Sequence, residues 1–298
     1  MVTFAWGTTF VLVKNVLEQV SPLVYNTLRM AVAAVALLTI FHRRLRGISH
    51  KTILGGMLVG VFLFLGYGFQ TTGLHLTTPS KYAFLTGLAV VLVPLIVAAA
   101  SRRLPTRWTA LGVLSAFAGL YLLTIPAGEK AFSLASVNRG DLLTIGCAIS
   151  FALHIFFTGQ MMKRHAFEHI SVVQVITAAM LMSLTIPLES PRFTWTGEVV
   201  FAIVFTGVVC TAVAFSVQAW AQQFTPATHT ALIFSTEPVF AAAASYVLIG
   251  ERLGVRGTFG ALLILGGILI SELKGAAVEP SAGFETSVPA KAESPAEL

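Results

Sequence analysis

The sequence predicts an all-α integral membrane protein with ten transmembrane helices arranged as two inverted five-helix repeats. Three observations lead to this prediction: few charged residues, long apolar runs along almost the whole chain, and an odd number of runs in each half. Of the 298 residues, 56% are hydrophobic and only 11% are charged, whereas an ordinary soluble domain has about 25% charged residues. In lipid every backbone polar group must be satisfied internally, and uncharged runs of about 20 residues do this as helices that cross about 30 Å.

Ten apolar runs bounded by turn-forming or charged residues define the expected spans. In the first half they cover residues 1–17, 22–41, 52–72, 80–100 and 108–125. In the second half they cover residues 140–162, 171–188, 197–219, 228–249 and 257–273. A first run of about 17 residues reaches only about 25 Å, so we expect the bilayer to thin locally or side chains to snorkel there.

The longest break between runs, residues 126–139, separates the two predicted repeats at 1–125 and 140–274. Its Pro, Gly, Ser and Asn content is typical of a linker. Residues 275–298 are rich in Ala, Glu, Pro and Ser. Because such a segment buries too little apolar surface to fold, it is expected to form a disordered polar tail.

The basic residues predict the orientation in the membrane. They gather in three short loops at 42–51, 101–107 and 163–164, which fall on one side if the spans are right. Positive loops face the cytoplasm, so we expect a bacterial-type inner (plasma) membrane location with both termini cytoplasmic. Arg252 and Arg256 fall on the opposite side and weaken this bias in the second half. The net charge of +6 forms no basic patch interleaved with aromatics, and no nucleic-acid partner is expected.

Because each half has an odd number of spans, five, the second half enters the membrane from the opposite side and has the opposite orientation. A shift of 148 residues pairs identical residues in matching spans: Gln70 with Gln218, Thr77 with Thr225, Gly112 with Gly260, and Gly119 with Gly267. The four glycines are expected to pack helices, because small residues let backbones approach closely. Inverted repeats are a common architecture of secondary transporters, with the substrate site at the repeat interface near the midplane.

Short motifs recur in a fixed order from Met1 to about Leu273. They are WGTTFV at 6–11, the stretch from Pro22 to Arg29, TPSKYAFLTG at 78–87 followed by Pro94, FSTEPVF at 234–240 with GERL at 250–253, and Gly260 with Gly266 and Gly267. This ordered set resembles the EamA-like families of the drug/metabolite transporter superfamily. The resemblance implies ten helices, cytoplasmic termini and transport of metabolites or amino-acid-like solutes, usually outward. Such proteins usually have about ten further residues before the Trp-Gly pair, so the first span is expected to be truncated or to begin at a misassigned methionine.

Ionisable residues inside spans are functional candidates, because a charge at mid-bilayer costs roughly 2.5 to 3.5 kcal/mol. Glu237 precedes Pro238, which removes a backbone hydrogen bond. On a continuous helix its face would carry Thr230, Ile233, Ala241 and Ala244. Glu237 would then bind a cationic substrate group or carry a proton. Alternatively, it is a structural acid that accepts hydrogen bonds at the proline break.

Three further ionisable residues have two interpretations each. His154, which the 148-residue shift pairs with Trp6, is either a proton relay or substrate hydrogen-bonding group, or a satisfied core histidine. Lys14 and Arg29 lie toward the outer ends of the first two spans. They either anchor the interface by snorkelling or form a positive rim for an anionic group such as a substrate carboxylate.

Neutral polar residues could line the same pathway or tie helices together at about 0.6 kcal/mol each. Gln70, Gln218, Tyr67, Tyr82, Thr86 and Gln174 belong to this group. The complete set of candidate residues for a substrate or proton path is Trp6, Thr9, Lys14, Gln70, Tyr82, His154, Gln218 and Glu237.

The sequence indicates no catalytic, cofactor-binding or metal site. Cys147 and Cys210 sit in apolar spans without metal-type spacing and are interpreted as small buried hydrophobes. There is no G-x-x-x-x-G-K-[ST] or H-E-x-x-H motif, which disfavours ATP hydrolysis and metalloenzyme chemistry. The leading prediction is therefore an exporting secondary transporter in the lipid bilayer that works by alternating access on a small-molecule substrate, coupled to protons or another ion. The alternatives are a passive channel and an intramembrane enzyme.

Overall fold

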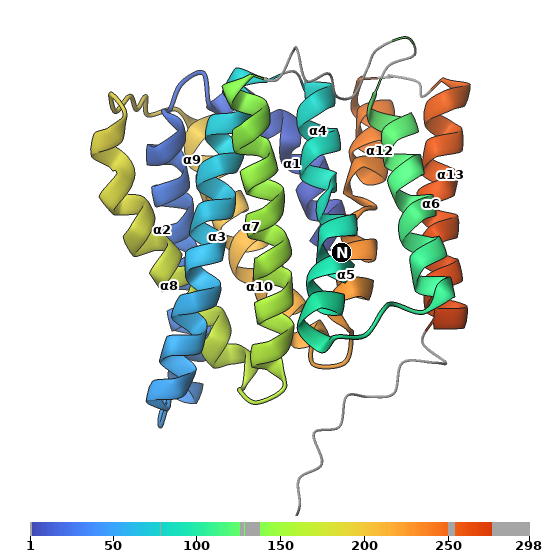
Figure 1. Cartoon of the computed structure of the whole chain (residues 1–298). Coiled ribbons are helices and arrows are strands. Elements are labelled where there is room, and N and C mark those ends of the chain that lie inside the picture. The colour runs from blue at the N-terminus through green and yellow to red at the C-terminus, as the bar shows by residue number, and fades with distance from the viewer. Residues whose placement is uncertain (1, 78, 126–127, 129–137, 250–253, 276–298) are drawn as a thin grey trace, which may run out of the picture.

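The computed structural model describes residues 2–77, 79–125, 128, 138–249 and 254–275 (Figure 1). This part of the chain is helical, with a single isolated β-bridge between Val20 and Phe193. Most of the predicted linker at 126–139, Arg252, and the predicted tail from residue 276 onward lie outside the described residues.

The described part of the first half contains six α-helices. They are α1 (Val2–Val16), α2 (Pro22–Phe41), α3 (His50–Leu76), α4 (Pro79–Gly87), α5 (Ala89–Ser101) and α6 (Arg107–Thr124). Their starts follow local chemistry: Pro22 occupies the first turn of α2, and the hydroxyls of Ser49 and Thr106 accept from backbone N–H groups of α3 and α6. Arg102 ends α5 in the left-handed conformation, with φ of 54°.

The second half contains seven α-helices. They are α7 (Arg139–Met162), α8 (Phe167–Thr185), α9 (Gly197–Gly207), α10 (Ala214–Ala221), α11 (Ala227–Phe234), α12 (Glu237–Ile249) and α13 (Val255–Ile270). A capping box of Asn138 and Asp141 starts α7. A π-helical segment, Val208–Val213, joins α9 to α10.

Seven helical stretches of the described chain are long and apolar enough to cross a membrane. They are Pro22–Arg44, His50–Leu74, Tyr82–Ser101, Arg107–Thr124, Arg139–Met162, Phe167–Leu188 and Gly197–Ala221. The remaining predicted spans correspond to shorter helices, of which α1 has 15 residues and α13 has 16. Large apolar side chains such as Val35, Leu114 and Leu262 are more than 60% exposed on the outside, as expected of a surface that faces lipid.

Two predicted spans are broken rather than continuous. The span predicted at 80–100 divides into α4 and α5 at Leu88, and the span predicted at 228–249 divides into α11 and α12 at Ser235 and Thr236. At the second break Pro238 cannot donate, and the hydroxyls of Ser235 and Thr236 bond the carbonyls of Leu232 and Ile233 at 2.6 and 2.7 Å.

This break corrects the predicted helix face around Glu237. That face assumed one continuous helix from Thr230 to Ala244. In the structure Glu237 instead starts a new helix, and Ile233, expected beside it, is 40% exposed.

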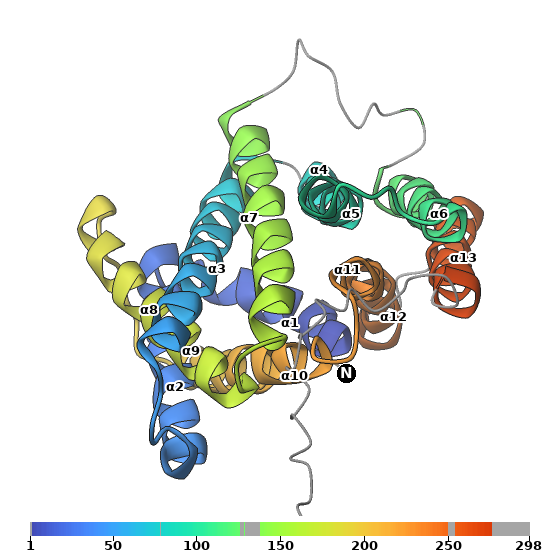
Figure 2. The same ribbon diagram turned by 60° about the horizontal axis from the view of Figure 1, so that its bottom comes forward.

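Helices α1, α4, α7 and α11 are arranged around the middle of the molecule in Figure 2. Helices α6 and α13 pack against each other at one side (Figures 1 and 2). The loops that join α2 to α3, α5 to α6, and α7 to α8 lie together at the lower end in Figure 1. We call this the basic end, because these loops hold the three clusters of Arg and Lys residues.

The α6–α13 pair is built on glycines. A Cβ added to Gly112 would lie 2.5 Å from the main-chain oxygen of Gly267, and one added to Gly119 would lie 2.5 Å from that of Gly260. Between these contacts the Ser115 hydroxyl donates to the oxygen of Leu263 at 2.9 Å. The backbones approach closely only because these four positions lack side chains.

Candidate functional site

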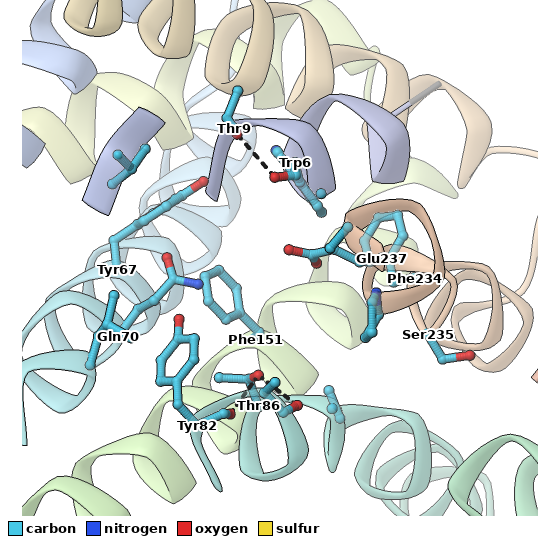
Figure 3. Close-up of a pocket in the computed structure, with 18 of the residues that line it drawn as sticks. Trp6, Thr9, Tyr67, Gln70, Tyr82, Thr86, Phe151, Phe234, Ser235 and Glu237 are labelled. Atoms are coloured by element: carbon cyan, nitrogen blue, oxygen red, sulfur yellow. Dashed lines mark hydrogen bonds between the residues drawn. The ribbon is translucent and has the colours of Figure 1, made fainter. Parts of the chain in front are cut away.

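A cavity of about 500 Å³ lies among the helices, with walls from both halves of the chain (Figure 3). Seven of the eight predicted path residues line it: Trp6, Thr9, Gln70, Tyr82, His154, Gln218 and Glu237. The side chain of the eighth, Lys14, lies outside what the structure describes. The break between α11 and α12 borders the cavity, since Phe234, Ser235 and Glu237 all line it.

Glu237 presents its carboxylate to the cavity from the first turn of α12 (Figure 3). Within the described chain no donor lies within hydrogen-bonding distance of this carboxylate, and no basic side chain pairs with it. A carboxylate in such surroundings can bind a cationic group or take up a proton. Of the two sequence interpretations, this geometry fits the cavity carboxylate better than the structural acid.

Arg29 does not snorkel to the interface, which corrects the anchoring interpretation. Its side chain is only 7% exposed and lines the cavity. The guanidinium donates to the Thr211 hydroxyl at 2.7 Å, the Tyr67 hydroxyl at 2.8 Å and the Cys210 main-chain oxygen at 3.3 Å. It also lies 4.5 Å from the centre of the Tyr67 ring. Among the described residues its acceptors are all neutral, so its charge has no carboxylate partner there.

The π-helix explains why acceptors are available at this depth. Its wider turn is the kind of local irregularity that recurs at functional sites. The main-chain oxygen of Cys210 accepts from the Trp6 indole at 2.8 Å as well as from Arg29, and the Thr211 hydroxyl bonds the oxygen of Thr206. The Cys210 thiol is buried, as the sequence indicated, but the main-chain oxygen is the group that reaches the site.

Aromatic rings form much of the cavity wall. Trp6 packs against Phe215 and Phe234 with ring centres 5.4 and 5.1 Å apart. Tyr67 packs against Phe151 and Phe215 at 5.5 and 6.1 Å. Sequence reasoning missed Phe151 and Phe215, because nothing distinguishes a cavity-facing Phe from a lipid-facing one in an apolar run.

His154 combines features of both sequence interpretations. It lines the cavity, and it is hydrogen-bonded to Gln174 of α8 at 2.9 Å and only 1% exposed. Its ring also packs edge-on against Phe215 at 5.4 Å. Gln174 was considered for the pathway, but the structure places it behind His154 rather than on the cavity wall.

The neutral polar candidates line the cavity, form hydrogen bonds that connect helices, or do both. Gln70, Tyr82 and Thr86 line the cavity, and the Thr86 hydroxyl bonds the oxygen of Tyr82 at 2.9 Å (Figure 3). Gln218 lines it too and donates to Gln222 at 3.1 Å, which in turn donates to the oxygen of Ile155 on α7 at 2.9 Å. The described residues contain no group of three or more His, Cys, Asp and Glu side chains that could hold a metal ion.

An internal cavity with charged and aromatic groups in a multi-pass helical protein is a typical arrangement of membrane transporters. Comparison with known proteins makes the assignment specific: the EamA-like transporter family matches residues 1–125 and 138–273, and the chain belongs to that family. It is therefore a membrane-embedded, multi-pass transporter of the drug/metabolite transporter superfamily.

Individual relatives agree with the family. An uncharacterized transporter of Archaeoglobus fulgidus is 31% identical over 92% of this chain and 84% of its own length. The uncharacterized transporter YoaV of Bacillus subtilis is 24% identical over 91% of this chain and 94% of its own. A crystal structure superposes with a TM-score of 0.78 over 94% of this chain and 96% of that one, at 19% identity, which establishes similarity of fold.

Proposed function

We propose that the protein is a secondary transporter that moves small amphipathic metabolites, with amino-acid-like solutes foremost, by alternating access. The observation that carries the proposal is the pair of opposite charges in one cavity. Arg29 and Glu237 both line it, and neither has an oppositely charged partner in the described part of the chain. Buried charges are costly unless they are paired, so a ligand that supplies both missing charges would be held between them.

A zwitterion satisfies this requirement. Its ammonium group would bind the Glu237 carboxylate, and its carboxylate would approach Arg29, whose Nη1 donates to no described residue. The rings of Trp6, Phe151 and Phe234 would cover the apolar part of the solute. A cavity of about 500 Å³ suits a solute of this size.

The ten-helix inverted repeat belongs to this proposal, and three relationships support it. The breaks at Leu88 and Thr236 are 148 residues apart, the same shift that pairs the identical residues. The shift pairs Gly112 with Gly260 and Gly119 with Gly267, so the contact of Gly112 with Gly267 is the repeat-related copy of the contact of Gly260 with Gly119. Ser115 bonds Leu263, its own counterpart. Broken helices at a repeat interface are typical of substrate sites in secondary transporters.

Orientation and direction are further parts of the proposal. The collection of Arg and Lys loops at one end supports a cytoplasmic position for that end, in a bacterial-type inner membrane with both termini cytoplasmic. Export rests on the usual direction of transport in this family. Coupling to protons rests on Glu237, whose carboxylate can be neutralised inside the cavity by either a proton or a cationic solute.

The decisive experiment has two parts. A metabolite screen that compares deletion and overexpression strains identifies the solute, and flux of that solute into inverted vesicles tests the transporter. Accumulation against a concentration gradient is expected. Flux only down the gradient would indicate a passive channel, and chemical change of the solute would indicate an intramembrane enzyme; either result contradicts the proposal.

A further inference from the structure

Helices α7, α8 and α10 carry buried polar side chains at the cavity wall and from there toward the basic end, and we call this group the polar seam. Its members are Thr158 of α7, Ser171 and Gln174 of α8, and Gln218 of α10. Each is at most 9% exposed. Apart from Gln218, none of them lines the cavity, so the site described above does not account for them.

The register of α7 and α8 places these groups on one level. The two helices are joined by a short turn at the basic end and diverge from it (Figure 1), and His154 meets Gln174 at 2.9 Å. Thr158 lies one helical turn beyond His154 toward that turn, and Ser171 lies one turn before Gln174, also toward it. The two hydroxyls therefore follow the His154–Gln174 pair in the direction of the basic end.

Helix α10 packs against α7 and α8 and adds its own polar side chains to the seam. Gln222 donates to the oxygen of Ile155, three residues before Thr158, and Gln218 donates to Gln222. The His154 ring packs on Phe215 of α10. A chain of polar groups thus runs from His154 and Gln218, at the cavity wall, to the level of Thr158 and Ser171.

Four atoms of the seam have unsatisfied hydrogen-bonding capacity. The Oγ1 of Thr158, the Oγ of Ser171, the Nε2 of Gln174 and the Oε1 of Gln218 are buried and meet no partner among the described residues. Buried polar atoms are normally paired with protein groups or with ordered water, and an internal water typically joins about three such groups. At that ratio these four atoms need more than one water.

An apolar layer lies between the seam and the basic end. Met162 of α7, Ile170 of α8 and Ala219 of α10 form one buried cluster, with Met161 and Phe167 packed against it. Met162 lies one turn beyond Thr158, so this layer covers the seam on the side away from the cavity.

We propose that the polar seam binds a file of water molecules and is the route by which protons pass between the cavity and the basic end. The route opens when the side chains of the apolar layer, Met162, Ile170 and Ala219, move apart. The proton-conducting role rests on the proton coupling of the proposed function. Each step breaks one O–H bond of a protonated water or hydroxyl and forms one on the next oxygen. The proton leaves to bulk water at the basic end, and no oxidant or reductant takes part.

The water site is tested by radiolytic footprinting of the whole protein, because hydroxyl radicals formed from bound water oxidise the nearest side chains. Met162 and Met30 are both buried, at 5% and 0% exposure. Met162 lies one turn from Thr158 in the apolar layer, whereas Met30 lies on α2 in a different buried cluster. Oxidation of Met162 well above that of Met30 is expected. Thr158→Val together with Ser171→Ala should reduce it severalfold, and equal labelling of Met162 and Met30 in the wild type would overturn the proposal even if the variants do not fold.

The proton route is tested in proteoliposomes with a mixture of the twenty protein amino acids as the probe and an entrapped pH dye as the reporter. Thr158→Val and Ser171→Ala, singly and together, should slow solute-driven proton movement at least tenfold and leave solute exchange unchanged. Thr144→Val and Ser150→Ala are matched controls, since these hydroxyls on α7 already bond the oxygens of Gly140 and Gly146.

The outcomes separate this inference from the proposed function. Full proton movement in the double variant would overturn the proton route alone. Solute flux without proton movement in the wild type would overturn both the route and the proton coupling on which it rests. Absence of any solute flux would contradict the proposed function, whereas the labelling of Met162 would still decide whether the seam holds water.

Discussion

The Trp6 indole donates a hydrogen bond of 2.8 Å to the main-chain oxygen of Cys210, within the π-helix that joins α9 to α10. Arg29 donates to the same oxygen at 3.3 Å. One carbonyl therefore holds α1, α2 and the π-helix together beside the cavity. The oxygen is accessible to both donors because the local helix is wider than an α-helix.

Replacing Trp6 with Phe tests this junction. The change keeps an aromatic ring against Phe215 and Phe234 but removes the hydrogen-bond donor. The free energy of unfolding should fall by about 1 kcal/mol and Tm by roughly 2 to 4 °C. Solute flux should fall severalfold. Thermal unfolding in detergent and flux in proteoliposomes measure the two effects. Trp220→Phe is the control, because Trp220 is half exposed and its ring contacts that of Phe224 at 5.8 Å. Equal effects of the two variants would show that the hydrogen bond is unimportant.

The α6–α13 contact gives a prediction about stability. In Gly112→Ala the new methyl carbon would lie 2.5 Å from the oxygen of Gly267, so the helices must separate, at a cost of about 1–3 kcal/mol. The same substitution at Gly266, the neighbour of Gly267 on α13, meets nothing within 4 Å and should be harmless. Unfolding of the two purified variants would be compared, and a Gly112→Ala protein as stable as Gly266→Ala would contradict close packing here.

Composition and spacing were sufficient to predict the helical membrane fold and much of the cavity wall. Polar residues are so rare in these apolar runs that Gln70, Gln218, Tyr82 and His154 stood out, and all four line the cavity. The glycines were recognisable for a similar reason, since the 148-residue shift repeats them. The break after Phe234 had a signal in Pro238. The break at Leu88 is preceded by Thr86 and Gly87, which were not interpreted as a helix break.

Other features could not be predicted because they depend on distant partners. Position in the span suggested that Arg29 would reach the interface, but Thr211, 182 residues away, offers an acceptor inside the protein. That acceptor depends on a π-helix whose sequence, VVCTAV, is ordinary apolar sequence. Likewise, Phe151 and Phe215 face the cavity only because of how their helices are rotated, which periodicity does not reveal when every face of the helix is apolar.

Arg29→Lys tests the anionic subsite of the proposed function. A lysine keeps the charge but lacks the planar fork that bonds Thr211 and Tyr67 together, so it cannot hold the same position. For the solute found by the screen, KM should rise at least tenfold, whereas an analogue without the carboxylate should be affected much less. Arg192→Lys, at an exposed position of the α8–α9 connection, serves as the control. Equal losses for the solute and its analogue would exclude Arg29 as the carboxylate site.

Glu237→Gln separates proton coupling from solute movement. The amide has nearly the same shape as the carboxyl group but cannot exchange a proton, and among the described residues no hydrogen bond to the carboxylate would be lost. The variant should fold normally and, at solute concentrations high enough to offset the lost contact with the ammonium group, still exchange solute across vesicles. Accumulation driven by a pH gradient should disappear. Glu198→Gln, which changes an exposed acid at the start of α9, should behave as wild type. Undiminished pH-driven accumulation in Glu237→Gln would remove Glu237 as the coupling group, and the proton would then have to bind at another group of the cavity.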